Sequence, residues 1–295
     1  MFILNDMNIG RFKVDVLDTG IFALDGGSMF GVVPKALWAK AYHPGDELNR
    51  IPLSARPLLV RWDDKKILID TGNGDKISDK LANIYSIDKS KSSLETALKQ
   101  FNLKPEEIDA VIFTHLHFDH AGGATKREGE KIIPSLPNAK FYVQKDHLDW
   151  AKNPTEKDRA SFFKDDFMPL LSDGLLETID GEGEIFQGIS VIPVNGHTKA
   201  MQTVKITDGG TTLYYCADLC PTNAHVPIPY VMGYDNFPLT AIEEKKKIIP
   251  QAYEEGWILC YEHDVFYQAS TVRSTEKGFL SGEKINISEE ASQKL

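Results

Sequence analysis

Short apolar runs recur along the chain, and their length and composition predict β-strands. The run DAVIFT at residues 109–114 is rich in β-branched and aromatic side chains, as expected of a buried strand. Residues that favour turns separate neighbouring runs, as Asp63 and Asp64 do between PLLVRW and KILID. Strands are therefore predicted at residues 12–20, 57–62, 66–70, 109–114, 139–143, 189–194, 211–217 and 257–261.

Amphipathic stretches lie among these strands and predict helices. Ser92 and Glu95 have the spacing of a capping box, and apolar side chains recur at helical spacing over residues 94–101. A second capping box, Thr240 with Glu243, predicts a helix that Pro250 would kink or end. Strands that alternate with helices in this way predict a mixed α and β domain.

The composition predicts one sizeable folded unit. The chain has 295 residues, of which 42% are hydrophobic, and this fraction is ample for a core. It contains no stretch with the composition of a linker, no low-complexity tract and no internal repeat. We therefore expect a single domain over residues 1–295.

Charge and sorting signals narrow the class of protein. Lys and Arg number 33 against 43 Asp and Glu, and this net charge of −10 disfavours a nucleic-acid partner. No apolar run is long enough for a transmembrane helix, and the N-terminal MFILNDMNIG lacks the features of a signal peptide. Cys216, Cys220 and Cys260 are too few for a disulfide framework and are expected to pack in the interior. A cytoplasmic protein without a membrane partner is predicted.

The segment THLHFDHAGG at residues 114–123 concentrates potential metal ligands. His115, His117, Asp119 and His120 fall within six residues, although the whole chain has only eight histidines. Where a strand ends and the chain is still extended, residues i and i+2 point the same way, so the first two imidazoles can hold one ion. The turn that follows would direct the other two side chains towards a second ion. Imidazole and carboxylate ligands suit Zn²⁺.

Three more potential ligands follow predicted strands. His197 comes after ISVIPV, Asp218 after TLYYCA, and His263 after WILCYE. A single His or Asp at the end of a strand is more often a cap or a surface residue. Their joint placement is informative, because loops at strand ends are where side chains from several strands converge.

This order of residues, H-x-H-x-D-H followed by His, Asp and His, resembles the metallo-β-lactamase-fold hydrolase superfamily over residues 12–265. The resemblance implies an α+β fold, a four-layer αββα sandwich of two mixed sheets flanked by helices. It also implies two divalent ions, zinc in the first place with Mn, Fe, Co or Ni as alternatives. The implied ligands are His115, His117 and His197 for the first ion, Asp119, His120 and His263 for the second, and Asp218 as the bridge. Asp70, in the segment Asp-Thr-Gly, would orient a ligand histidine.

The same resemblance implies metal-dependent hydrolysis. A hydroxide shared by two ions would attack an electrophilic centre, with Asp218 fixing the separation of the ions and Asp119 moving the proton. Within the superfamily the chain is most similar to the quorum-quenching N-acyl homoserine lactonases and the methyl parathion hydrolase-like enzymes. It departs from some lactonases in having Pro221 where they place a tyrosine, and Lys-Ala after Gly-His-Thr.

A lactonase or esterase is therefore the leading hypothesis. A phosphotriesterase or phosphodiesterase is the alternative within the same class of enzyme. A non-catalytic sensor that binds a small molecule on the same fold is the alternative from another class. Assays with a lactone and an aryl phosphotriester separate the first two, and ligand binding without turnover would indicate the third.

Three connections, residues 25–50, 161–171 and 225–237, are rich in apolar side chains. Because loops over a fixed scaffold commonly select the substrate, they are interpreted as walls of a pocket for a small molecule with an apolar portion. Core cover and the interface of a homodimer are the alternatives. His43 and His147 are expected to be surface or helix residues. The pocket candidates are Met29, Phe30, Val33, Trp38, His225, Tyr230 and Tyr234.

Overall fold

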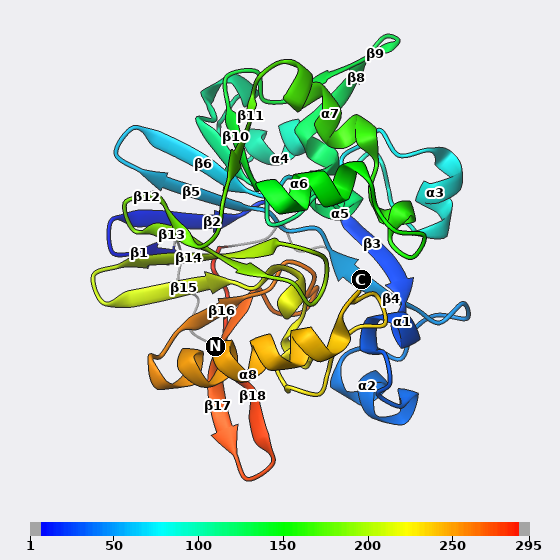
Figure 1. Ribbon diagram of the computed structural model, residues 1–295, viewed down its shortest axis with the longest axis vertical. Helices are drawn as coiled ribbons and strands as arrows, with labels where there is room; N and C mark the ends of the chain where they lie inside the picture. The colour runs from blue at the N-terminus through cyan, green and yellow to red at the C-terminus, as the bar shows by residue number, and fades with distance from the viewer. Residues whose placement is uncertain (1–6, 289–295) are drawn as a thin grey trace. The chain divides into compact units, whose positions relative to one another are not determined.

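A computed structural model describes residues 7–288 of the chain (Figure 1). Residues 1–6 and 289–295 lie outside this range. Residues 1–6 make up most of the N-terminal segment that, by its sequence, is not expected to be a signal peptide. The described strands form two mixed seven-stranded sheets and two two-stranded sheets. The chain divides into two compact units: the 54–181 unit, which also includes residues 12–22, and the 182–288 unit, which also includes residues 7–11 and 23–53.

The 54–181 unit is built on the first large sheet, of order β1-β2-β5-β6-β7-β10-β11, of which only β1 lies in the other unit. Strands β6, β7, β10 and β11 are parallel, so the carboxyl ends of β6 and β7 lie at the same edge. The strands are β2 (Phe12–Val16), β5 (Leu58–Trp62), β6 (Lys65–Ile69), β7 (Ala110–Ile112), β10 (Lys140–Gln144) and β11 (Leu176–Ile179), with a separate hairpin of β8 (Thr125–Glu128) and β9 (Lys131–Pro134).

Helices flank this sheet and share one apolar core with it. The helices are α3 (Asp79–Ile84), α4 (Leu94–Lys99), α5 (Phe118–Ala121), α6 (Lys145–Lys152) and α7 (Lys164–Ser172), with short turns of 3₁₀ helix at Pro105–Glu107, Gly122–Ala124 and Arg159–Ser161. Leu98 of α4 and Phe167 of α7 are fully buried in the same cluster as Val111 of β7. Burial of each large apolar side chain contributes roughly 1.5–3 kcal/mol to the stability of the fold. This packing holds the helices against the sheet that carries the motif.

The 182–288 unit contains the second large sheet, of order β12-β13-β14-β15-β16-β17-β18. Its helix α8 (Pro238–Glu254), gold in Figure 1, runs beside β17, and Ile249 lies in one core cluster with Tyr214 and Trp257, whose rings stack at 5.2 Å. The strands are β1 (Met7–Ile9), β12 (Gly183–Phe186), β13 (Ile189–Val194), β14 (Met201–Asp208), β15 (Thr211–Tyr215), β16 (Ile258–Cys260), β17 (Ala269–Thr275) and β18 (Gly278–Ile285).

Residues 25–50 are folded rather than an open loop. Strands β3 (Ile21–Asp25) and β4 (Arg50–Ser54) pair with each other and enclose helices α1 (Gly26–Phe30) and α2 (Lys35–Ala41). The side chain of Asp25 caps α1 by accepting a hydrogen bond of 2.7 Å from the backbone N–H of Ser28. Within residues 7–288, no helix combines the length and hydropathy that crossing a membrane requires.

Two helix boundaries differ from those predicted. The residue that caps α4 is Ser93, whose Oγ accepts from the backbone N–H of Thr96, whereas Ser92 is buried and donates to the carbonyl of Asp88. Helix α8 begins at Pro238 and continues past Pro250 to Glu254, so of the two predicted alternatives an end at this proline is wrong, and a kink there stays a prediction. Ala252, beyond the proline, is buried, so the apolar face of the helix continues past Pro250.

Candidate metal centre

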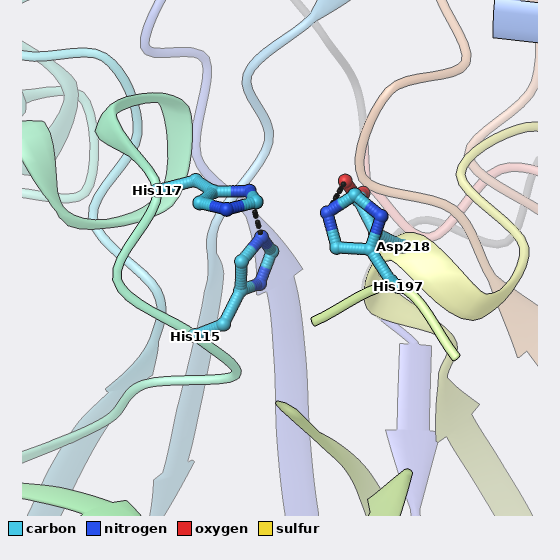
Figure 2. Close-up of side chains that lie close together, drawn as sticks. All are labelled: His115, His117, His197 and Asp218. Carbon is cyan, nitrogen blue, oxygen red and sulfur yellow. Dashed lines mark hydrogen bonds and ion pairs between the residues drawn. The ribbon is translucent and has the colours of Figure 1, made fainter. Parts of the chain in front are cut away.

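The histidine motif follows β7 and runs into the short helix α5. His117 is the residue that precedes this helix, and Asp119 and His120 lie within it. All four predicted ligands of the motif are buried, at 7% exposure or less. The imidazole nitrogens His115 Nε2 and His117 Nδ1 are 3.0 Å apart (Figure 2), and His120 Nε2 is 4.0 Å from Asp119 Oδ2. Two ligand atoms on one tetrahedral ion with bonds of about 2.0–2.2 Å would be about 3.3–3.6 Å apart. The first observed spacing is slightly shorter than this range and the second slightly longer, so small side-chain shifts would bring each pair onto one ion.

Asp70 holds the motif from the neighbouring parallel strand. It directly follows β6, with a positive φ of 59°, and its Oδ1 accepts from the backbone N–H of Thr114 at 2.7 Å. Its Oδ2 accepts from Thr114 Oγ1 at 2.7 Å and lies 3.0 Å from His120 Nδ1. Because a carboxylate only accepts, this contact places the His120 proton on Nδ1 and leaves Nε2 with a lone pair for a metal.

Two glycines let the backbone of the motif pass close to the segment after Asp70. A Cβ atom on Gly122 would lie 2.0 Å from the carbonyl oxygen of Asn73, and one on Gly123 would lie 2.2 Å from that of Thr71. Any side chain at either position would therefore clash with backbone. The backbone N–H of Thr71 also donates to the carbonyl of His120 at 2.7 Å, which ties the two segments together.

Two residues near the motif were missed or misplaced by sequence reasoning. His147 lies in α6 as predicted, but it is fully buried, and its Nε2 accepts from the backbone N–H of Leu116 at 2.8 Å. Of the two predicted alternatives, a helix residue is therefore confirmed and a surface residue is wrong, and the hydrogen bond it accepts holds the loop between the first two ligands. Tyr85 is the second of these residues, and the sequence does not indicate its place near Asp119. Burial raises the pKa of Tyr85, and the nearby Asp119 carboxylate raises it further.

The 182–288 unit brings together the other three predicted ligands. Asp218 lies in a 3₁₀ turn, Ala217–Leu219, just after β15, and all three side chains are buried. Its Oδ2 is 3.1 Å from His197 Nε2 (Figure 2), and its Oδ1 is 3.1 Å from His263 Nε2. One carboxylate oxygen thus faces each imidazole, which is the arrangement of a carboxylate that serves two ions.

Asp235 contacts the other nitrogen of His197 and was not predicted from sequence. Its Oδ1 lies 3.0 Å from His197 Nδ1, and its Oδ2 accepts from the backbone N–H of Met232 at 2.9 Å. A neutral imidazole carries one N–H, yet both nitrogens of this histidine face carboxylate oxygens. A cation bound at Nε2 would satisfy the second of these contacts, and imidazole with carboxylate is a set of ligands that Zn²⁺ prefers.

The predicted ligands all belong to groups of side chains that could hold a metal ion. The members of these groups are His115, His117, Asp119, His120, His197, Asp218 and His263, together with Asp70 and Glu262. Glu262 was not predicted, although it precedes His263 and is fully buried. The residues present therefore fit the divalent ions that the sequence predicts.

Most of the pocket candidates pack against one another in the 182–288 unit. Phe30 is fully buried and stacks on His225 at 4.5 Å and on Trp38 at 5.5 Å, and it meets Tyr230 edge-on at 6.2 Å. Met29 is also buried, and its carbonyl lies 2.8 Å from His225 Nε2. Val33 and Tyr234 are half-buried. The residues 25–50 thus contribute apolar core, and contact of these side chains with substrate stays a prediction.

Lys245 fixes the backbone of the neighbouring segment, residues 225–230. Its ammonium group is fully buried and donates to the carbonyl oxygens of His225, Pro227 and Tyr230, at 2.5, 2.9 and 2.8 Å. Burial lowers the pKa of Lys245. No pattern in the sequence indicates this role, because a lysine in an amphipathic helix such as α8 is usually exposed.

The burial of His225 makes the stability of the fold depend on pH. Its Nε2 donates to a carbonyl, its Nδ1 lies 2.7 Å from Thr222 Oγ1, and burial lowers its pKa from 6.5 to about 3. The neutral form is favoured in the folded state, so this stability is complete above pH 6.5 and is lost as the pH falls towards 3. Metal-free protein should lose about 2 kcal/mol of unfolding free energy from this group between pH 7 and pH 5.

Urea unfolding of wild type and His225→Gln at both pH values measures this loss. The variant should show the smaller difference between the two pH values, and His43→Gln should behave as wild type. Equal pH dependence of wild type and His225→Gln would contradict the assignment.

The three cysteines are buried and form no disulfide, as the sequence predicts. Burial raises the pKa of the Cys216 and Cys220 thiols, so they stay protonated near neutral pH. Neither has the thiolate character of a nucleophile or a metal ligand.

A family model decides which proteins this chain is related to. The model of the metallo-β-lactamase superfamily matches residues 52–263, well over half of the chain, and this range contains all seven predicted ligands. The chain belongs to the metallo-β-lactamase superfamily. The predicted resemblance and the predicted class of enzyme, a metal-dependent hydrolase, are confirmed.

Relatives in the superfamily include lactonases. The N-acyl homoserine lactonase of Bacillus cereus is 25% identical over 235 residues, which cover 75% of this chain and 84% of that protein. A lactonase of a Bacillus species is 27% identical over 172 residues, and this match spans 57% of this chain and 60% of the relative.

Solved structures confirm the metallo-β-lactamase fold. A probable metal-dependent hydrolase from Staphylococcus aureus has a TM-score of 0.85 and 29% identity, with 95% of this chain and 100% of that chain covered. The dizinc quorum-quenching lactonase AidC has a TM-score of 0.79 and 18% identity, with 96% and 98% covered. The predicted α+β class, with two mixed sheets and flanking helices, is confirmed.

Proposed function

We propose that this member of the metallo-β-lactamase superfamily is a dinuclear-metal lactonase or esterase that acts on a small, partly apolar substrate. The observation that carries the proposal is the position of Asp218, with one oxygen 3.1 Å from His197 and the other 3.1 Å from His263. A carboxylate placed in this way can serve two ions, and the lactonases among the relatives favour a lactone as the substrate.

The ligands of the two proposed ions are those that the family resemblance implies. Asp218 is the proposed bridge, and Asp70 and Asp235 orient His120 and His197 through their Nδ1 atoms. When bound, the two ions would polarise the scissile carbonyl and lower the pKa of a shared water. The ligands proposed for the first ion are His115, His117 and His197, and those for the second are Asp119, His120 and His263.

The protein's own groups carry the remaining steps. Asp119 is the proposed proton carrier, which accepts a proton at a carboxylate oxygen as the carbonyl is attacked and delivers it to the leaving alkoxide. Its burial, at 6% exposure, keeps bulk water from competing for that proton. Phe162, whose ring lies 4.5 Å from that of His117, adds an apolar wall beside the ligands.

Elemental analysis followed by a panel of substrates tests the proposal. We expect two metal equivalents per chain and hydrolysis of a lactone that exceeds hydrolysis of an aryl phosphotriester in Zn²⁺-, Mn²⁺- and Co²⁺-loaded protein. Faster phosphotriester turnover would favour the alternative enzyme. Ligand binding without turnover at any metal loading would favour the sensor. Zinc as the resident ion, the cytoplasmic location, the single domain and the homodimer remain predictions.

A further inference from the structure

One carboxylate of helix α8 holds the two residues that precede His197. Strand β13 ends at Val194, and Asn195 and Gly196 lie between it and His197. The backbone N–H of Asn195 donates to Glu244 Oε1 at 2.6 Å, and that of Gly196 donates to Glu244 Oε2 at 3.0 Å. Hydrogen bonds to an ionised acceptor are roughly twice as strong as those between neutral groups, so a single side chain fixes two consecutive peptide groups.

The residues just before α8 hold the carbonyl groups of the same segment. The backbone N–H of Phe237 donates to the carbonyl of Gly196 at 2.8 Å, and that of Asn236 donates to the carbonyl of His197 at 2.9 Å. With the two bonds to Glu244, both N–H and C=O groups of residues 195–197 are therefore paired with residues 236–244.

The backbone of α8 also lies directly against Gly196. A Cβ atom on this glycine would lie 2.4 Å from the Cα and 2.5 Å from the Cβ of Ala241. Ala241 is buried and precedes Glu244 by three residues, so the contact and the two hydrogen bonds come from the same face of the helix. The segment before His197 cannot approach α8 more closely, and its hydrogen bonds keep it from moving away.

Separate groups fix the ring and the backbone of His197, which is drawn in Figure 2. Asp235 Oδ1 lies 3.0 Å from His197 Nδ1 and so limits rotation of the imidazole. Glu244 holds the peptide groups before this residue and so limits movement of its Cα atom. Both are needed for a precise site, because a bond of about 2.0–2.1 Å between a metal and an imidazole nitrogen tolerates little displacement.

We propose that Glu244 is a positioning residue of the metal centre, which holds the backbone before His197 so that this ligand is in place before the first ion binds. The inference rests on the proposed function, because it takes His197 as a metal ligand. The hydrogen bonds themselves belong to the protein alone and exist without metal.

Hydrogen exchange in the metal-free wild type tests these bonds without any variant. Relative to their intrinsic rates, the amides of Asn195 and Gly196 should exchange at least about tenfold more slowly than that of Gly210, in the exposed turn after β14. Exchange as fast as at Gly210 would overturn the proposal, because the segment would then not be held before metal binds.

Glu244→Gln measures the effect on metal binding. The new amide has the shape of the carboxylate, but its NH₂ group would face a backbone N–H, so one of the two hydrogen bonds is lost. The affinity for one of the two ions should fall about tenfold, as for other residues that support ligands. The matched control is Glu243→Gln, in the exposed pair with Lys246, which should bind metal as wild type does. Wild-type affinity for both ions in Glu244→Gln would overturn the proposal.

A second substitution tests whether Glu244 acts through His197. In a His197→Ala background, Glu244→Gln should cause no further loss of metal affinity, whereas a general effect on the fold would cause the same loss again. The visible absorption of bound Co²⁺, which reports the geometry of its ligands, should change in Glu244→Gln and stay as wild type in Glu243→Gln. A repeated loss of affinity or an unchanged spectrum would overturn the positioning role.

Metal content and turnover separate this inference from the proposed function. If Glu244→Gln weakens one ion through His197 but wild type hydrolyses no lactone, the proposed activity fails and the inference stands. If wild type hydrolyses a lactone and Glu244→Gln binds both ions as tightly, the inference fails alone. A wild-type protein that binds no metal would overturn both.

Discussion

Replacement of Asp218 by asparagine should lower metal content and reduce lactone hydrolysis by at least about a hundredfold. Loss of residues that only support metal ligands commonly costs 10–100-fold in affinity or activity, so the loss of a proposed bridging ligand should exceed this range. An asparagine keeps the shape of the side chain but replaces one carboxylate oxygen by an amide nitrogen, which is a poor metal ligand. Elemental analysis and kcat/KM for a lactone measure the two effects.

The matched control is Asp173→Asn, since Asp173 is exposed at the end of α7. It should retain wild-type metal content and activity. Metal-free Asp218→Asn and metal-free wild type should both unfold cooperatively, and this result would separate loss of the site from loss of the fold. An Asp218→Asn variant that keeps two metal equivalents and full activity would contradict the bridging role.

Replacement of Lys245 by methionine should cost about 2–5 kcal/mol of unfolding free energy. The change removes the donor to three carbonyl oxygens in a fully buried site, and each acceptor left unsatisfied there costs about 1–3 kcal/mol. The variant no longer buries the charge of Lys245, and this gain offsets part of the cost. The expected loss is therefore smaller than the summed cost of three unsatisfied carbonyl oxygens. Urea unfolding of the metal-free protein measures the difference.

The adjacent Lys246 offers a close control for this experiment. Its ammonium group pairs with Glu243 at 2.7 Å on the exposed face of α8, where such a pair is worth about 0–1 kcal/mol. Lys246→Met should therefore lie within about 1 kcal/mol of wild type. Equal stability of the two variants would show that the carbonyl groups find other partners.

The parts of the fold that the sequence predicts are those set by local patterns. Apolar runs identify strands such as β7, in which every residue is buried, and β13, in which Ile189, Val191 and Val194 are buried and the others are half-buried. The hairpin of β17 and β18 was missed, since many of its side chains are half-buried or exposed and its sequence lacks an apolar run. The position of the cap of α4 differed by one residue because two serines stand side by side.

The residues of the candidate site also fall into two groups, those that the sequence indicates and those that only the folded structure shows. Its ligands were found because their spacing along the chain is itself informative. Asp235, Glu262 and His147 were not identified as supporting residues, since each acts through a contact that only the folded chain creates.

The order in which the two units alternate along the chain has a consequence for synthesis on the ribosome. The 54–181 unit has all of its residues once translation passes residue 181. Residues 23–53, which belong to the other unit, emerge early and must wait for the last hundred or so residues before their partners exist. Until then His225 and Tyr230, the later residues against which Phe30 packs, have not been made, so this early segment should expose apolar surface during synthesis.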